Sequence, residues 1–325
     1  MNVVVTGASG HVGTCLVHKL LEVGHQVRVV NFEPAPHLDT LDIEEVTGDV
    51  RDIHSLRTAF VNQDVLLHLA AFISVDDRDS ALLKAVNTDG VRNAAQAALD
   101  CGIQRMVHVS SVEVYKMWRL GRPLREDDAR ADESDSAYAR SKAAGEVALQ
   151  EIVAQGLNAT MLNPMGIIGP YDYAPSLAGR LLMQMYQGKV PLVPNGGFSW
   201  VDVRDVADMI IAAITKGGVG ENYLLSSEYL TMMEIAQVCN EIGGKRSGYA
   251  SMPMSLLHLG VPFAQFFNRF NNTRLSFTHH SLRTVNSQLT VDTSKAQREL
   301  DFQPRPVRET VHDTIAWFQK YNYLT

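Results

Sequence analysis

The chain has 325 residues, of which 46% are hydrophobic and 20% are charged, so it can bury the core of one large globular unit or of two associated lobes. Its formal net charge of −7 argues against a nucleic acid as the main partner, because binding to phosphates needs clustered lysine and arginine. The three cysteines, Cys15, Cys101 and Cys239, are far apart, which indicates buried thiols of a reducing compartment and predicts no metal site.

The N-terminus predicts a cytoplasmic protein. No basic region precedes an apolar run, and Val3–Val5 leads directly into a glycine-rich turn, so we expect no removable signal. We also expect no integral membrane segment, because no stretch reaches about 20 uninterrupted apolar residues. The nearest candidate, 252–270, has two interpretations: a buried helical pair beside the substrate pocket, or an apolar lid that touches lipid.

The first half of the chain alternates short apolar runs with longer amphipathic segments. Strands that alternate with helices predict a parallel sheet covered on both faces, so we expect an α/β fold with a Rossmann-type doubly wound sheet. Such sheets bind ligands at the carboxyl ends of their strands. In chain order we expect a strand at Asn2–Thr6, a helix at His11–Val23, strands at Gln26–Asn31, Glu45–Gly48 and Val65–Ala70, a helix at Leu82–Asp100, a strand at Arg105–Ser110, a helix at Ser136–Ala154 and a strand at Ala159–Asn163.

A change of pattern after residue 163 indicates a second lobe. Residues 1–163 form the expected dinucleotide-binding domain. From Pro164 onward glycine and proline become frequent and the alternation weakens, so 164–325 is expected to be mainly a smaller, mostly helical substrate-binding lobe. Within it, the strand and helix of 198–217 are expected to return to the first domain. The last expected helices are Thr293–Leu300 and Val307–Tyr321.

The sequence TGASGHVG lies directly after the first strand and before the first helix. Gly7 permits a tight turn, Gly10 lets the backbone approach a pyrophosphate, and Gly13 allows the helix to pack closely on the strand. The helix N-terminus then points free N–H groups at the phosphates. This context predicts dinucleotide binding. The expected cofactor-binding residues of the turn are Gly7, Ser9, Gly10, His11, Val12 and Gly13.

Tyr138 and Lys142 stand four residues apart in YARSK, so they point the same way from one helix face. A lysine ammonium near a phenol favours the phenolate and lowers the pKa of the tyrosine. Tyr138 is therefore expected to act as an acid and base close to neutral pH. Together with the glycine-rich turn, the pair predicts hydride transfer at a carbon that bears oxygen.

The GxxGxxG spacing with YxxxK downstream resembles the extended short-chain dehydrogenase/reductase family, over nearly the whole chain. Within this family the pattern is most similar to dihydroflavonol-reductase-like, hopanoid-associated-epimerase-like and 3β-hydroxysteroid-dehydrogenase-like members. Several further segments match the family in order and spacing: Asp49-Val50-Arg51-Asp52, His68-Leu69-Ala70-Ala71, Asn87 within Val86–Gly90, Ser110–Tyr115, Asn163-Pro164 through Gly169-Pro170, and Asp292–Ala296 with Glu299-Leu300.

The resemblance implies which residues bind the cofactor and which carry out the reaction. Tyr138 would exchange a proton with the substrate, Lys142 would bind the nicotinamide ribose, and Ser111 would hydrogen-bond the reacting oxygen. The implied activity is that of an NAD(P)-dependent oxidoreductase acting on a small-molecule substrate. The resemblance also implies a homodimer formed through Leu82–Asp100 and Ser136–Ala154. Tyr138 and Lys142 are expected to contact the cofactor as well. The further cofactor residues are Asn31, Asp49 and Val50 at the adenosine, Leu69, Ala70 and Ala71 along the cofactor, Asn87 behind the active-site backbone, and Pro164 beside the nicotinamide.

The end of the second strand favours NAD over NADP. Family members that prefer NAD often carry Asp where Asn31 stands, and those that prefer NADP often carry Arg where Phe32 stands. Neither is present, but Glu33 would repel a 2′-phosphate. Arg51 could fold back and favour the phosphate, so NADP stays possible.

Net oxidation or reduction is favoured over two other reactions of the family. Sugar-nucleotide 4,6-dehydratases carry an Asp-Glu pair where Val112 and Glu113 stand, and the Asp is missing. Asn163 is similar to the asparagine with which 4-epimerases meet a nucleotide-sugar, although reductases often have it too. An epimerase would also need cations for the diphosphate. The candidates in the second lobe are Arg180, Arg204, Arg274 and Arg283, of which Arg204 is expected to be structural.

The second lobe is apolar in several places, which suits a steroid-like, flavonoid-like or aldehyde substrate. Its methionines and aromatic residues can equally belong to a core. Two alternatives therefore stay open beside the oxidoreductase: a sugar-nucleotide epimerase with transient hydride transfer, and a non-catalytic NAD(P)-sensing protein. The residues in question are Met183, Met185, Tyr186, Phe198 and Trp200, with the stretch 252–270.

Overall fold

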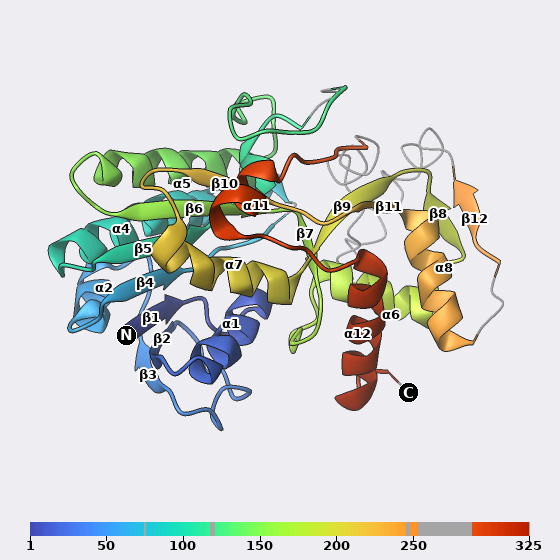
Figure 1. Cartoon of the computed structure of the whole chain (residues 1–325), viewed down its shortest axis with the longest axis horizontal. Coiled ribbons are helices and arrows are strands. Elements are labelled where there is room, and N and C mark those ends of the chain that lie inside the picture. Colours follow the sequence, from blue (N-terminus) through green and yellow to red (C-terminus); the bar gives the residue numbers. More distant parts are fainter. Residues whose placement is uncertain (75, 118–120, 245–247, 253–287, 325) are drawn as a thin grey trace.

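A seven-stranded parallel sheet forms the centre of the first lobe (Figure 1). The structure is a computed structural model, and it describes residues 1–74, 76–117, 121–244, 248–252 and 288–324. The strand order is β10-β6-β5-β4-β1-β2-β3, and every pair is parallel, which confirms the doubly wound α/β fold. The strands are β1 (Asn2–Thr6), β2 (Gln26–Asn31), β3 (Glu44–Thr47), β4 (Val65–His68), β5 (Arg105–Val109), β6 (Ala159–Pro164) and β10 (Asn222–Leu225).

Helices cover both faces of this sheet, because successive side chains of a buried parallel strand point to opposite sides. On β1, Val3 and Val5 pack toward one face and Val4 toward the other. The layers are visible in Figure 1, with α1 and α7 below the sheet and α4 and α5 above it. The helices of this lobe are α1 (His11–Glu22), α2 (Ile53–Phe60), α3 (Ser80–Lys84), α4 (Gly90–Asp100), α5 (Ala137–Val153) and α7 (Val203–Lys216).

The expected helix at Leu82–Asp100 is divided in the structure. A π-helical turn at Ala85–Asp89 separates α3 from α4 and carries Asn87 at its centre. The short helix α2, with Asp52 as its N-cap, was not predicted. It has only eight residues, too few for a clear helical period in the sequence.

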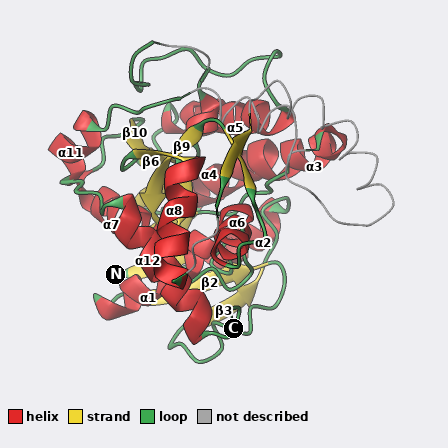
Figure 2. Cartoon of the chain, turned by 90° about the vertical axis from the view of Figure 1, so that its right-hand side faces the viewer, coloured by secondary structure: helices red, strands yellow, loops and turns green. Residues whose placement is uncertain are grey.

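In the described part of the chain, the second lobe combines helices with two small sheets, and these helices face the viewer in Figure 2. A shared apolar cluster joins the helices to the three-stranded sheet, which has the order β11-β9-β7. The elements are β7 (Gly166–Ile168), α6 (Leu177–Tyr186), β8 (Leu192–Pro194), β9 (Gly197–Asp202), β11 (Tyr229–Thr231), α8 (Met232–Gly243), β12 (Ala250–Met252) and α12 (Val307–Lys320).

The return of the chain to the first lobe differs from the expected strand and helix at 198–217. Strand β9 belongs to the small sheet, where it pairs with β7 and β11. Helix α7 does return and packs against α1. The seventh strand of the main sheet is β10, which pairs with β6 and is followed much later by α11 (Ser294–Leu300) beside it.

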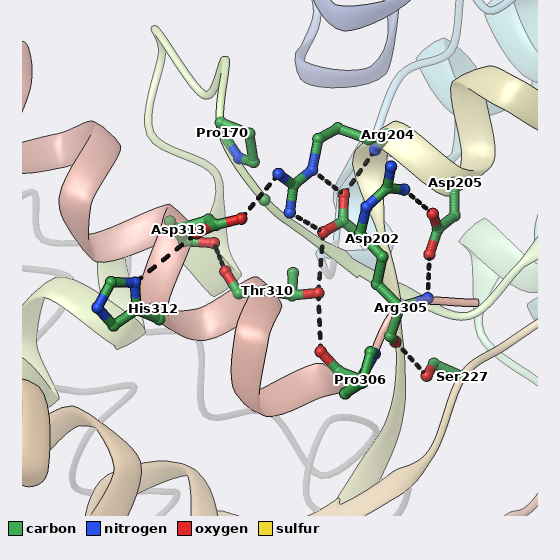
Figure 3. Close-up of polar contacts among 12 residues, drawn as sticks. Pro170, Asp202, Arg204, Asp205, Ser227, Arg305, Pro306, Thr310, His312 and Asp313 are labelled. Atoms are coloured by element: carbon green, nitrogen blue, oxygen red, sulfur yellow. Dashed lines mark hydrogen bonds and ion pairs between the residues drawn. The ribbon is translucent and has the colours of Figure 1, made fainter.

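An ion-pair network joins α7 to α12 and so links the lobes (Figure 3). Asp202 caps α7 by accepting from the Arg204 backbone N–H at 2.7 Å, and its carboxylate also pairs with the Arg204 guanidinium at 2.6 Å. The same guanidinium reaches Asp313 on α12 at 2.7 Å, and the Thr310 hydroxyl donates to Asp202 at 2.8 Å. Arg204 is thus a structural cation. Arg305 adds a second link by pairing with Asp205.

Two of the three cysteines are buried as free thiols, as the sequence predicts. Cys15 and Cys239 are buried free thiols, whereas Cys101 is only half-buried. Burial raises the pKa of Cys15 and of Cys239 to about 12.

In the described part of the chain, each helix is too short or too polar to cross a lipid bilayer. The stretch 252–270 lies, apart from Met252, outside the described residues.

We predict that Asp202→Ala lowers the free energy of unfolding by about 3 kcal/mol or more, because the buried carboxylate caps α7, accepts from Thr310 and forms one of the two ion pairs of Arg204. Urea unfolding followed by circular dichroism measures the loss. Glu241→Ala is the matched control. Glu241 on α8 also forms an ion pair with α12, through Arg308, but both of these side chains are exposed. The control should cost about 1 kcal/mol at most. Equal losses in the two variants would contradict the role given to the buried network.

Candidate active site

The glycine-rich turn has the tight geometry that its sequence predicts. Gly7 has a φ of +76°, and a Cβ there would lie 2.6 Å from the Ala70 nitrogen. A Cβ on Gly13 would lie 2.2 Å from the Gly7 carbonyl oxygen, so helix α1 can start only because this side chain is missing. The inner side of the turn is therefore closed by Leu69 and Ala70, which follow β4, and by the backbone of the turn itself.

The outer side of the turn fits an anion. Gly10 is the N-cap of α1, no side chain caps the helix, and the first turn has no acidic residue. Ser9 and Gly10 are exposed, and a Cβ on Gly10 would meet no atom closer than 3.4 Å. Free N–H groups and the partial positive charge of the helix then face outward. These features suit the pyrophosphate of a dinucleotide.

Where the adenosine end is expected, Arg51 does fold back toward the second strand. Its guanidinium carbon lies 5.1 Å from the ring centre of Phe32, directly after β2. The same guanidinium is held by Asp49, with Nη2 at 2.6 Å from Oδ2. Asn31 is buried and donates to Glu45 at 3.0 Å. The guanidinium that could hold a 2′-phosphate is thus already paired with a carboxylate, which disfavours the phosphate and agrees with NAD.

The segment after β4 is fixed by Asn87. The Asn87 amide donates to the Phe72 carbonyl at 2.9 Å and accepts from the Phe72 N–H at 2.8 Å. It also donates to the Ser141 hydroxyl on α5 at 3.1 Å. Leu69 is tied to β1 through its N–H, which donates to the Thr6 carbonyl at 3.0 Å. The strip Leu69–Ala71 therefore has a fixed path beside Gly7.

Ser111, Tyr138 and Lys142 meet at the carboxyl end of β5. Ser111 follows this strand and its hydroxyl accepts from the Glu113 N–H at 3.1 Å. Ser136 caps α5 and so sets the start of the helix that carries the other two residues. The Ser111 side chain hydrogen-bonds to Tyr138. The Lys142 ammonium is buried and donates to the Val109 carbonyl at 3.2 Å.

The expected lowering of the Tyr138 pKa is not what the structure shows. Burial raises the pKa of Tyr138 above its ordinary value, the Glu113 carboxylate raises it further, and only the hydrogen bond from Ser111 lowers it. Lys142 points its ammonium at a strand carbonyl instead. The prediction was wrong because spacing on a helix does not reveal how completely water is excluded from a phenol.

Lys142 is itself perturbed by its surroundings. Burial lowers the pKa of Lys142 to about 8, although the neighbouring Glu146 carboxylate acts to raise it. The balance leaves the ammonium mostly protonated at neutral pH. Glu146 stands one helical turn after Lys142, so Tyr138, Lys142 and Glu146 follow one another along one face of α5.

Two buried histidines beneath Lys142 were not anticipated as part of the site. His68 on β4 and His108 on β5 are paired in register, and their rings stack with centroids 5.2 Å apart. His68 Nδ1 is hydrogen-bonded to the Thr6 hydroxyl at 2.7 Å. Burial lowers the pKa of His68 to about 3 and that of His108 well below its ordinary value, with Lys142 adding to both shifts. Both imidazoles are therefore neutral near pH 7.

Of the residues considered for a nucleotide-sugar, the structure describes Arg180, Arg204 and Asn163. Arg204 is held in ion pairs with Asp202 and Asp313, and Arg180 is exposed on α6. Arg274 and Arg283 lie outside the described residues. Asn163 is completely buried, donates to the Ser111 carbonyl at 3.0 Å and to Glu146 at 2.6 Å, and accepts from Asn222 at 2.9 Å. Its amide is thus occupied by the protein.

The apolar residues of the second lobe mainly form its core. Met185 and Trp200 are buried in the cluster that joins α6, α8, α12 and β9. The other three residues named from the sequence, Met183, Tyr186 and Phe198, are partly buried and pack against the same cluster. These five side chains therefore do not by themselves define an apolar substrate pocket.

Comparison with known sequences finds a single family and several reaction types. A sequence model of the NAD dependent epimerase/dehydratase family matches residues 3–226. The chain is 34% identical to "Sterol demethylase protein B" of Methylococcus capsulatus, over 98% of this chain and 99% of the relative. It is 29% identical to "Cinnamoyl-CoA reductase 1" of Oryza sativa subsp. japonica, over 99% of this chain and 91% of the relative.

Comparison with solved structures agrees on the fold. A nucleoside-diphosphate-sugar epimerase from Pseudomonas aeruginosa aligns over 100% of this chain and 99% of its own, with a TM-score of 0.81 and 19% sequence identity. At this identity the likeness concerns the arrangement of the elements. The overlap extends through both lobes.

We predict that the stability of the protein falls in mild acid because of His68. Below pH 6.5 the unfolded imidazole binds a proton that the folded one refuses until about pH 3, so each unit of acidification costs about 1.4 kcal/mol for this group. His68→Asn removes this contribution. Between pH 6.5 and about 4.5, urea titrations should show the variant losing about 2 kcal/mol less than the wild type.

The control for this prediction is His54→Asn, at an exposed histidine on α2. It should leave the pH dependence of unfolding as in the wild type. An unchanged pH dependence in His68→Asn would show that His68 is protonated in the folded protein, contrary to its burial.

Proposed function

Because the chain belongs to the NAD dependent epimerase/dehydratase family, we propose that this NAD-dependent enzyme catalyses net hydride transfer between its cofactor and a secondary alcohol or carbonyl carbon. One observation carries the proposal: Ser111, Tyr138 and Lys142 converge at the carboxyl edge of the sheet beside the Gly7–Gly13 turn. In an open α/β sheet this edge is where ligands bind.

Ser111 and Tyr138 supply the acid chemistry of the proposed reaction. A phenol with a raised pKa stays protonated at neutral pH, so Tyr138 can donate its proton to a carbonyl oxygen as that oxygen becomes negative. The Ser111 hydroxyl, hydrogen-bonded to the same phenol, can stabilise the developing charge. When bound, NAD provides the hydride acceptor or donor and, in its oxidised form, a positive ring charge that favours the phenolate.

Lys142 places a fixed positive charge close to Ser111 and Tyr138. Its buried ammonium is anchored to the end of β5 through the Val109 carbonyl. From there it can donate to the ribose hydroxyls of the cofactor, on the same helix face as Tyr138. Asn31, Asp49 and Val50 are proposed to receive the adenosine end, and Leu69–Ala71, Asn87 and Pro164 to border or support the nicotinamide end.

The proposed substrate is an uncharged, mainly apolar alcohol or ketone of sterol size. Two observations support this class over a sugar nucleotide. The relatives named above include one that carries sterol demethylation in its name and one named as a reductase of cinnamoyl-CoA. In addition, both N–H groups of the Asn163 amide are donated within the protein, to Ser111 and Glu146, which leaves it no free donor for a nucleotide-sugar. The cytoplasmic location and the homodimer stay predictions.

We predict a stoichiometric change of NADH absorbance when the enzyme meets a 3-hydroxysterol with NAD, or a 3-ketosterol with NADH. Uridine-diphosphate glucose serves as the comparison substrate. Conversion of that sugar nucleotide to its 4-epimer without net NADH formation would contradict the proposal, since an epimerase returns its hydride to the substrate.

We predict that Tyr138→Phe lowers kcat by about 100- to 10,000-fold, the usual contribution of a positioned general acid. The dissociation constant of NADH, measured by fluorescence titration, should stay within about twofold of the wild type because the phenol is not a phosphate ligand. Tyr171→Phe, at a tyrosine in the loop after β7, is the control and should retain activity. A Tyr138→Phe enzyme with native turnover would refute the acid role.

A further inference from the structure

A buried carboxylate lies behind the proposed catalytic groups, and the reaction as proposed gives it no role. Glu146 is 4% exposed and stands one turn beyond Lys142 on α5. A charge removed from water in this way is costly unless it is paired and hydrogen-bonded. Its partners therefore indicate what the carboxylate does.

Both oxygens of Glu146 are held by groups from other parts of the chain. Oε1 accepts from the Asn163 amide on β6 at 2.6 Å. Oε2 accepts from Asn222 on β10 at 2.9 Å and pairs with the Arg130 guanidinium at 2.8 Å. Arg130 also lies over the ring of Tyr115, with its guanidinium carbon 4.2 Å from the centroid. Three other segments of the chain thus meet at one carboxylate of α5.

One of these contacts leads directly to the proposed active site. The amide nitrogen that donates to Glu146 Oε1 also donates to the carbonyl oxygen of Ser111, at 3.0 Å. The Asn163 carbonyl oxygen accepts from Asn222 at 2.9 Å, which fixes the orientation of the amide. The position of the Ser111 backbone is consequently tied to Glu146 through a single bridging side chain.

We propose that Glu146 is a positioning residue for the hydride-transfer reaction, which holds the Ser111 backbone through Asn163 and supplies the negative charge that faces Lys142. The expected effect of Glu146 on turnover rests on the proposed function. Its expected effect on the pKa of Lys142 does not. The other groups near Lys142 carry no opposing charge: Tyr138 is a neutral phenol, and His68 and His108 are neutral imidazoles.

The charge and the geometry of Glu146 can be separated by two substitutions. Glu146→Gln keeps the length of the side chain and removes the charge. Glu146→Asp keeps the charge that pairs with Arg130 but withdraws the carboxylate from Asn163 by one methylene. Glu151→Gln, which neutralises an exposed carboxylate on the same helix, is the matched control.

Two readouts are measured on each variant. The titration of Lys142 is followed by NMR of the protein with lysine labelled at the ε-carbon, and its signal is assigned with Lys142→Arg. This measurement needs no substrate, so it remains informative if the proposed reaction is wrong. The second readout is kcat with a ketosterol and NADH across pH, together with the dissociation constant of NADH as a test of the cofactor site.

In Glu146→Gln, the Lys142 pKa should fall from about 8 by about one unit, because a neighbouring opposite charge no longer favours the ammonium. The alkaline loss of kcat should then begin about one pH unit lower than in the wild type. In Glu146→Asp, kcat should fall about 10- to 100-fold, with the Lys142 titration and NADH binding close to the wild type. Glu151→Gln should change neither readout.

An unaltered Lys142 titration in Glu146→Gln would overturn the electrostatic part of the proposal. Native kcat in Glu146→Asp would overturn the positioning part. If Glu146→Gln does not fold, Asn163→Ala takes its place as a second test of the bridge: native kcat in that variant overturns the proposal, and reduced kcat with an unchanged Lys142 titration supports it. A wild-type enzyme without turnover on any alcohol or ketone rejects the proposed function, while the Lys142 titration still decides the charge of Glu146.

Discussion

The site depends on how closely helix α5 approaches the π-helical turn Ala85–Asp89. Gly145 makes this approach possible, since a Cβ at this position would lie 2.1 Å from the carbonyl oxygen of Asn87. Because nothing separates the two backbones there, Asn87 reaches both Phe72 and Ser141 with its amide. The face of α5 that carries the phenol, the ammonium and the carboxylate is thereby pressed against the edge of the sheet where the cofactor is proposed to bind.

Burial at this contact explains the electrostatics of the site. A phenol becomes a weaker acid and an ammonium a stronger one when water is excluded, and the shifts of Tyr138 and Lys142 follow this rule. The two histidines below them are uncharged for the same reason. Glu146 tolerates its burial because Arg130 and two amides surround it. The positive charge of Lys142 is therefore compensated from inside the protein and not by solvent.

The sequence alone predicts what depends on neighbours along the chain. Strands β1 and β2 were predicted to the residue, and the glycine-rich turn with its helix was recognised because its signals are contiguous. The features that were missed depend on long-range contacts. The segment Asn222–Leu225 is too short to be recognised as the last strand of the main sheet, and β9 pairs with small strands far from it in sequence. The role of Asn163 stayed ambiguous, because the sequence does not show whether the amide of an asparagine is buried in the protein or contacts a ligand.

The position of β10 in the sheet has a consequence for how the protein acquires its structure during synthesis. This strand pairs with β6 and brings Asn222 to Glu146, although some sixty residues separate the two strands in the chain. While the ribosome is still producing that interval, the nascent chain has an open edge on β6 and a carboxylate that lacks one of its partners. The first lobe therefore does not mature as an independent unit. Its sheet is completed only when β10, which follows several elements of the second lobe in the chain, pairs with β6.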